Sequence, residues 1–148
     1  MHRLACVDLP AFPLQLLLRR RPDWRGRPAV IVEADRPQAP ILWASAEARA
    51  AGVLRGQRYA HALSLTGELR ADVVPATEIA AAIEEVATAL RGFSPEVDAA
   101  IDEPGVCWLD GRGMHALHRS ATQWGKAIAG AVAARGLEGA VVVGFTRF

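Results

Sequence analysis

The sequence predicts an α+β fold in which helices pack on one side of a mostly antiparallel sheet. Short β-branched and apolar runs alternate with segments of helical periodicity, and some successive strands are separated only by a short turn. Hydrophobic residues make up 51% of the 148 residues and charged residues 22%, a balance typical of globular proteins with a sizeable core. No apolar run reaches the roughly 18 residues that a membrane span requires. The chain also opens without a signal peptide, so we expect a cytoplasmic protein with no membrane partner.

The first third of the chain contains three predicted strands and one helix. Residues 4–9 form an apolar strand that ends at Asp8 and is stopped by Pro10, and residues 14–18 form a short helix. Residues 29–33 and 41–43 are β-branched and apolar runs on either side of a proline-rich turn, which is typical of two neighbouring strands.

The middle of the chain is predicted to be mainly helical. Ser45 can cap a short helix over residues 46–51, and a second small helix follows over residues 57–65. Val73 and Val74 are expected in a short strand. From Thr77 as N-cap, apolar residues at helical spacing predict a helix that Gly92 closes.

The last third alternates strands with one helix. Residues 97–101 are expected to be extended, and residues 106–110 predict a strand more clearly. Ser120 and Gln123 form a possible capping box before a helix that runs to about residue 135, and residues 140–145 predict a final core strand. The chain stops directly after this strand with no closing element. We therefore expect residues 1–148 to be one N-terminal region of a longer protein.

Charge and cysteine content exclude little. The net charge is +1, without the basic excess that is typical of nucleic-acid-binding domains, and Cys6 and Cys107 are expected to be buried free thiols. Five arginines nevertheless fall between positions 19 and 27, and they are equally consistent with a solvated basic face and with a phosphate-contacting patch.

Acidic residues at the ends of predicted strands are the main candidates for chemistry. They are Asp8, the pair Asp102 and Glu103, and Asp110. Carboxylates that converge from neighbouring strands can hold a pair of divalent ions for phosphoryl transfer. The alternative is that each of them caps a turn in solvent, and the spacing alone favours that alternative.

Four segments (residues 7–15, 44–53, 93–110 and 141–145) are similar, in this order, to the motifs of the Y-family (UmuC-like) translesion DNA polymerases. Residues 7–15 (VDLPAFPLQ) resemble the first motif, in which an aspartate after a strand is followed by an aromatic residue and a glutamine. Residues 44–53 (ASAEARAAGV) resemble the E-A-R-x-x-G-[VI] helix. Residues 93–110 resemble the segment around the [SL]-[IL]-D-E-A-Y-L-D motif, and residues 141–145 (VVVGF) resemble the late palm strand. The resemblance covers nearly the whole chain.

This resemblance implies a polymerase palm (ferredoxin-like) with part of the fingers, truncated at its C-terminus. It implies metal ligation by Asp8, Asp102 and Glu103, with Mg²⁺ as the possible cofactor, and contact of Arg49 with the incoming triphosphate. The implied partners are primer-template DNA, bound by the full-length protein, together with a replicative-type polymerase, the sliding clamp and a RecA-like accessory protein.

Two positions depart from the pattern of active members. Pro13 stands where active members carry a bulky steric-gate aromatic residue, and Ala46 replaces an aromatic residue just before the E-A-R motif. In these two departures, and in the sequence of residues 8–15 (DLPAFPLQ), the chain resembles the ImuB-type members of the family. Those members are accessory, non-catalytic proteins of damage-induced mutagenesis (the SOS response).

The alignment of the second acidic motif leaves two alternatives. If Asp102 and Glu103 match the acidic pair of the family, all three metal ligands exist, but three residues must be inserted before Cys107. If the strand is aligned without a gap, the ligand positions fall on Gly105 and Val106. A strand does not absorb three residues without a large bulge, and the sequence Pro-Gly at 104–105 is a turn signal, so the gapless alignment is favoured. The sequence thus predicts a degenerate, non-catalytic translesion factor, with an active nucleotidyltransferase as the alternative.

Overall fold

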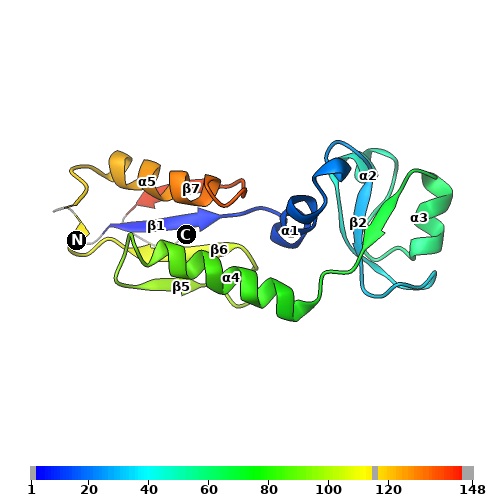
Figure 1. Cartoon of the computed structure of the whole chain (residues 1–148), viewed down its shortest axis with the longest axis horizontal. Helices are drawn as coiled ribbons and strands as arrows, with labels where there is room; N and C mark the ends of the chain where they lie inside the picture. The colour runs from blue at the N-terminus through cyan, green and yellow to red at the C-terminus, as the bar shows by residue number, and fades with distance from the viewer. Residues whose placement is uncertain (1–2, 115–116, 145–148) are drawn as a thin grey trace. The chain divides into compact units, whose positions relative to one another are not determined.

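The computed structural model describes residues 3–114 and 117–144, and within them the chain forms two compact units (Figure 1). Unit 1 comprises Met1–Phe12 and Ala80–Phe148, and unit 2 comprises Pro13–Ile79. No helix in the described part of the chain is long and apolar enough to cross a membrane.

Unit 1 contains a four-stranded, fully antiparallel sheet in the order β5-β6-β1-β7. Its strands are β1 (Leu4–Asp8), β5 (Val97–Ala99), β6 (Val106–Asp110) and β7 (Ala140–Gly144). The chain's first strand is therefore central and pairs on both sides with strands that are about 100 residues or more away in the sequence. Phe145, expected in the last strand, lies outside the described residues.

Helices α4 (Ala76–Leu90) and α5 (Ala121–Ala133) lie on the same side of this sheet (Figure 1). The side chains of β1 and β6 alternate accordingly: Ala5, Val7, Cys107 and Leu109 are at most 2% exposed, whereas the residues between them are partly or fully exposed. α5 approaches β7 closely, because a Cβ on Gly125 would lie 3.4 Å from Val143. This is the predicted arrangement of helices on one face of an antiparallel sheet.

Unit 2 is built on a three-stranded sheet in the order β3-β2-β4. β2 (Ala29–Val32) pairs antiparallel with β3 (Ile41–Ala44) and parallel with β4 (Arg70–Asp72). The remaining elements are helix α1 (Phe12–Arg20, in unit 2 from Pro13 on), the 3-10 turn η1 (Pro22–Trp24), α2 (Ala46–Ala50) and α3 (Tyr59–Leu65).

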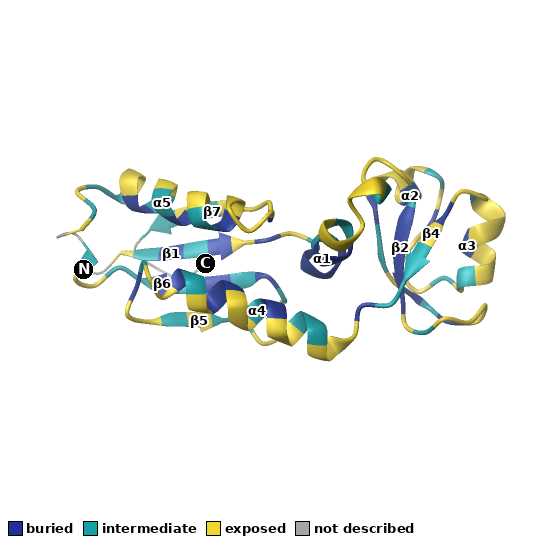
Figure 2. Cartoon of the chain, in the orientation of Figure 1, coloured by how far each residue is buried: buried dark blue, intermediate teal, exposed yellow. Residues whose placement is uncertain are grey.

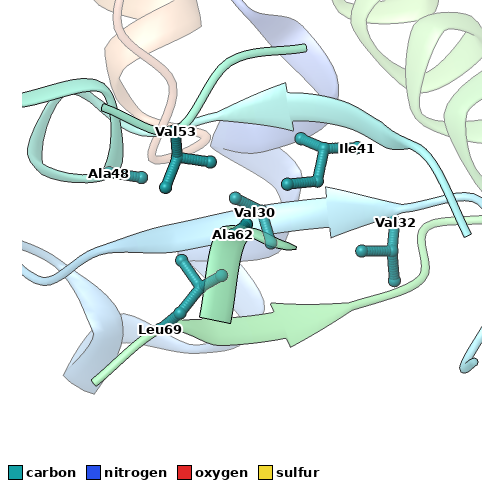
Figure 3. Close-up of a cluster of buried hydrophobic side chains, with 7 residues drawn as sticks. All are labelled: Val30, Val32, Ile41, Ala48, Val53, Ala62 and Leu69. Atoms are coloured by element: carbon teal, nitrogen blue, oxygen red, sulfur yellow. The ribbon is translucent and has the colours of Figure 1, made fainter. Parts of the chain in front are cut away.

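One face of the unit 2 sheet is closed by a small apolar core (Figure 3). Figure 2 shows that burial in this unit centres on β2, all four residues of which are at most 3% exposed. The cluster contains side chains from β2 and β3, from helices α2 and α3, and from the connections that follow these helices. Its members are Val30, Val32, Ile41, Ala48, Val53, Ala62 and Leu69.

Two predicted helix caps form in the structure. The hydroxyl of Ser45 accepts a hydrogen bond from the Ala48 N–H (3.2 Å), and that of Ser120 accepts one from the Gln123 N–H (3.1 Å). The Gln123 side chain accepts from the N–H of Arg119 instead of that of Ser120, so the predicted capping box is displaced by one residue.

The strand predicted at Val73 and Val74 is displaced in the structure. β4 ends at Asp72, because only Arg70–Asp72 reach a partner, in parallel register with residues 29–31. Val74 is buried (5% exposed) as part of the connection to α4. Apolar content alone therefore located a buried segment but not its strand pairing.

Candidate functional site

Asp8 is the last residue of β1, and its side chain is exposed. It lies opposite Val106 of β6 on one side and Ala140 of β7 on the other. In β1 it shares a face with Leu4 and Cys6, which is the face opposite to the helices. Asp8 is therefore presented at the end of a central strand, on the uncovered side of the sheet.

Asp102 and Glu103 lie in the turn between β5 and β6, and both are exposed. Two backbone hydrogen bonds define this turn: the Ala100 N–H donates to the Val106 carbonyl (2.9 Å), and the Val106 N–H donates to the Glu103 carbonyl (3.1 Å). β6 begins only at Val106. This arrangement agrees with the gapless alignment, in which the acidic pair precedes the strand.

Gly105 is buried against the end of β1. Its carbonyl accepts a hydrogen bond from the Leu9 N–H (2.9 Å), and its φ of +99° is in the region that favours glycine. A Cβ at this position would lie 2.6 Å from the Leu9 carbonyl oxygen and 2.8 Å from the Cβ of Phe12. The position that the gapless alignment assigns to a metal ligand therefore has no room for a side chain.

A second glycine closes the other side of the same strand end. A Cβ on Gly139 would lie 2.5 Å from the Asp8 carbonyl oxygen and 2.6 Å from the Leu9 side chain. Two backbone segments therefore pack against the end of β1 at positions that have room only for glycine: Gly105 before β6 and Gly139 before β7.

Asp8 and Glu103 both affect the pKa of one neighbouring group, the thiol of Cys6. The pKa of Cys6 is raised first by burial and then by the negative charges of Asp8 and Glu103. The fields of these two carboxylates therefore reach the same point on the uncovered face.

The candidate residues are not assembled as a metal site. In residues 3–114 and 117–144, no three acidic, histidine or cysteine side chains are placed to hold an ion. A pair of bridged divalent ions needs several oxygen ligands at about 2.0–2.6 Å. Among the described residues, the side chains at the end of β1 do not form such a ligand set.

Arg49 and Ala46 belong to unit 2. Arg49 is exposed in the last turn of α2, and Ala46 is the exposed first residue of that helix. Ser45 positions the helix: its hydroxyl accepts from the Ala29 N–H (3.0 Å) and donates to the Arg27 carbonyl (3.3 Å). The guanidinium of Arg49 is thus presented to solvent from a helix anchored on the sheet of unit 2.

The arginines between positions 19 and 27 are partly occupied within unit 2. Arg20 pairs with Asp72 (3.2 Å) and Glu78 (3.0 Å), and it donates to the Val73 carbonyl. Arg21 lies 3.7 Å from Asp72 and stacks over Trp24. Part of the cluster therefore joins α1 to the end of β4 and to the first turn of α4.

Comparison with known protein families identifies the family of this chain. Residues 7–148 match the impB/mucB/samB family. The chain belongs to this family. The match begins one residue before Asp8 and includes the segment from Gly105 to β7. The impB/mucB/samB assignment agrees with the predicted UmuC-like resemblance.

Solved structures show the same fold. A Y-family DNA polymerase chimera of Dbh and Dpo4 superposes with a TM-score of 0.77 at 16% identity, over 95% of this chain and 42% of that one. An insertion ternary complex of Dbh DNA polymerase gives 0.78 at 17% identity, over 98% and 43%. DinB from Sulfolobus solfataricus gives 0.73 at 17% identity, over 98% and 42%.

The chain thus has the fold of a Y-family polymerase palm, as the sequence predicted, and it spans 42% to 43% of the lengths of these polymerases. No curated protein sequence matches it.

Sequence reasoning missed a cation–π pair in unit 2 and the role of Gly139. The guanidinium of Arg55 lies 4.3 Å from the ring centroid of Trp43. No local signal links these two residues, because β3 and the loop after α2 meet only through the fold. Gly139 directly precedes β7, and no local signal in the sequence indicates that it approaches Asp8.

Proposed function

We propose that this impB/mucB/samB-family protein is a non-catalytic, polymerase-like accessory factor in DNA damage tolerance and translesion synthesis, of the ImuB type. The observation that carries the proposal is Gly105, whose backbone packs against Leu9 and Phe12 where the gapless alignment expects a metal ligand. The proposal keeps the palm fold and assigns the activity to partners.

Two further positions support a non-catalytic role. Pro13, at the expected steric-gate position, is buried, and Ala46 leaves α2 without the expected aromatic side chain. Phosphoryl transfer by this fold relies on metal ions and on positioning of the triphosphate. A chain without an assembled set of metal ligands, and without aromatic residues at positions 13 and 46, would keep the family fold but not catalyse phosphoryl transfer.

The partners that we propose follow from this role. They are primer-template DNA through the complete natural protein, a replicative-type polymerase, the sliding clamp and a RecA-like accessory protein, in the cytoplasm during damage-induced mutagenesis. Unit 2 is the more basic part, with ten arginines and seven acidic residues (net +3), whereas unit 1 has seven basic and nine acidic residues (net −2). Contact with phosphates is therefore assigned to unit 2.

An active Mg²⁺-dependent polymerase is the second candidate. It is favoured by the exposure of Asp8 at a strand end and by the field of Glu103, which reaches the same thiol. A small movement of the β5–β6 turn, followed by ion binding, would be needed to bring Asp102 and Glu103 to Asp8.

Primer extension separates the two candidates. The complete natural protein is incubated with primer-template DNA, the four deoxynucleotides and Mg²⁺ or Mn²⁺, beside the Asp8→Ala variant. The accessory role predicts no extension by either protein. Extension that disappears with Asp8→Ala would establish the polymerase and overturn the accessory role.

A further inference from the structure

The side of the unit 1 sheet that no described helix covers, which we term the open face, is continuous across all four strands. Strand pairing places Asp98, Trp108, Cys6 and Val142 in one row, and it places Val106, Asp8 and Ala140 in the next. The opposite ends of β1 and β6 add Leu4 and Asp110.

This face is apolar at its centre and remains open to solvent. Val142 is 49% exposed, and Trp108, Cys6 and Val106 are intermediate in exposure, although each has a fully buried neighbour on the helix side. Neighbouring strands are about 4.8 Å apart, so four strands span about 14 Å, which is slightly wider than an α-helix with its side chains. A single helix would therefore cover the central row.

The charged residues that the four strands place on this face are all acidic. The four strands of unit 1 contain three aspartates and no lysine or arginine, and all three aspartates lie on the open face. Asp110 is paired with Arg112 (3.4 Å), which leaves the Asp8 end as the more negative one.

These observations select among occupants. DNA phosphates would be repelled by this face in the absence of bridging cations, and the site described above is not assembled to hold such ions. A partner with a basic rim and an apolar stripe would match both the acidic residues and the partly exposed apolar centre of the face.

We propose that the open face docks a basic, amphipathic helical segment of a protein partner. The proposal rests on the non-catalytic function above, because a metal site at Asp8 would occupy the same face.

Cys6 provides a built-in probe, because it lies at the centre of the face while Cys107 is only 2% exposed. The rate of alkylation of Cys6 by uncharged iodoacetamide is followed by mass spectrometry on the 148-residue protein, with Cys107 as the internal indicator of unfolding. The probe is an amphipathic peptide of leucine and lysine of about 18 residues, which is about 27 Å long as a helix. Its counterpart with glutamate in place of lysine is the control.

The expected result is saturable protection of Cys6 by the lysine peptide alone, with protection reduced as salt shortens the Debye length from about 10 Å at 0.1 M to about 3 Å at 1 M. Absence of protection by the lysine peptide would overturn the proposal. Equal protection by both peptides would overturn the preference for a basic partner, because binding would then depend only on apolar contact. Protection by primer-template DNA with Mg²⁺, and not by the peptide, would assign it to nucleic acid.

Matched variants test the role of charge. Asp8→Asn combined with Glu103→Gln is expected to weaken the apparent affinity for the lysine peptide by about tenfold. Glu85→Gln, on the exposed side of α4, is expected to leave it unchanged. An unchanged affinity in the double variant would refute the electrostatic part. Primer extension is measured separately, so a failure of docking does not coincide with a failure of the proposed function.

Discussion

Replacement of Gly105 by alanine tests how the end of β1 is held in place. The substitution puts a methyl group 2.6 Å from the Leu9 carbonyl oxygen and 2.8 Å from the Phe12 Cβ, both below the closest approach that real Cβ atoms make. Neither neighbour is the tip of a flexible side chain. Relief therefore requires the backbone of residues 9–12 or of the β5–β6 turn to move.

Three contributions set the magnitude. A non-glycine residue at positive φ costs about 1–2 kcal/mol, and overpacking at a tight site costs about 1–3 kcal/mol. Weakening of the hydrogen bond from the Leu9 N–H to the Gly105 carbonyl adds about 1 kcal/mol. The expected loss is about 3–6 kcal/mol, a large part of the 5–15 kcal/mol that is typical of whole domains.

The assay is urea unfolding followed by circular dichroism, with Gly113→Ala as the matched control. Gly113 also has positive φ (+73°), but a Cβ there meets no atom within 4 Å, so this variant should lose only about 1–2 kcal/mol. If Gly105→Ala destabilises no more than Gly113→Ala, the close packing at the end of β1 is refuted. For the same reason, Gly105→Asp should lower stability without creating a functional metal ligand.

Three other predictions concern single side chains. Ser45→Ala should lower the free energy of unfolding by about 1–3 kcal/mol, because it removes the α2 cap and leaves the buried Ala29 N–H without its partner; a loss equal to that of the exposed cap variant Ser120→Ala would contradict this. Asp8→Asn should lower the pKa of Cys6 and so accelerate its alkylation near pH 8, whereas an unchanged rate would remove Asp8 as a cause. Burial raises the pKa of the Cys107 thiol from 9.0 to about 11. The neutral buried thiol therefore contributes fully to stability below pH 9, and this contribution is lost as the pH rises to about 11. Over this range the wild-type protein should lose about 2 kcal/mol more unfolding free energy than Cys107→Ala, and parallel pH profiles of the two proteins would contradict this.

The sequence was most informative where local signals decide the structure. The caps at Ser45 and Ser120 and the apolar spacing of α4 and α5 locate those helices to within a few residues. β1 and β6 were also predictable, because each is a short apolar run bounded by a turn signal.

Features that depend on distant segments were less accessible. β4 forms at Arg70–Asp72, and not at Val73 and Val74, because its strand character comes from pairing with β2. The division of the described chain into two units, and the approach of Gly139 to Asp8, likewise depend on contacts between residues more than 60 positions apart.

The candidate site was predictable in part. The turn signal at residues 104–105 correctly separated Asp102 and Glu103 from β6. The sequence could not show that Gly105 is enclosed by Leu9 and Phe12, because that contact arises only when β1 and β6 pair. Whether Asp8, Asp102 and Glu103 act together as metal ligands in the complete protein stays a prediction, as does the role of Arg49 toward a triphosphate.

Binding of Mn²⁺ is the most direct test of the central claim that the palm fold is retained without an assembled metal site. Titration of the chain with Mn²⁺, followed by electron paramagnetic resonance of the free ion, is compared with the same titration of Asp8→Asn and Glu103→Gln. The account predicts weak binding that is the same in all three proteins. Stoichiometric binding by the wild-type chain that both substitutions abolish would contradict it and restore the polymerase interpretation.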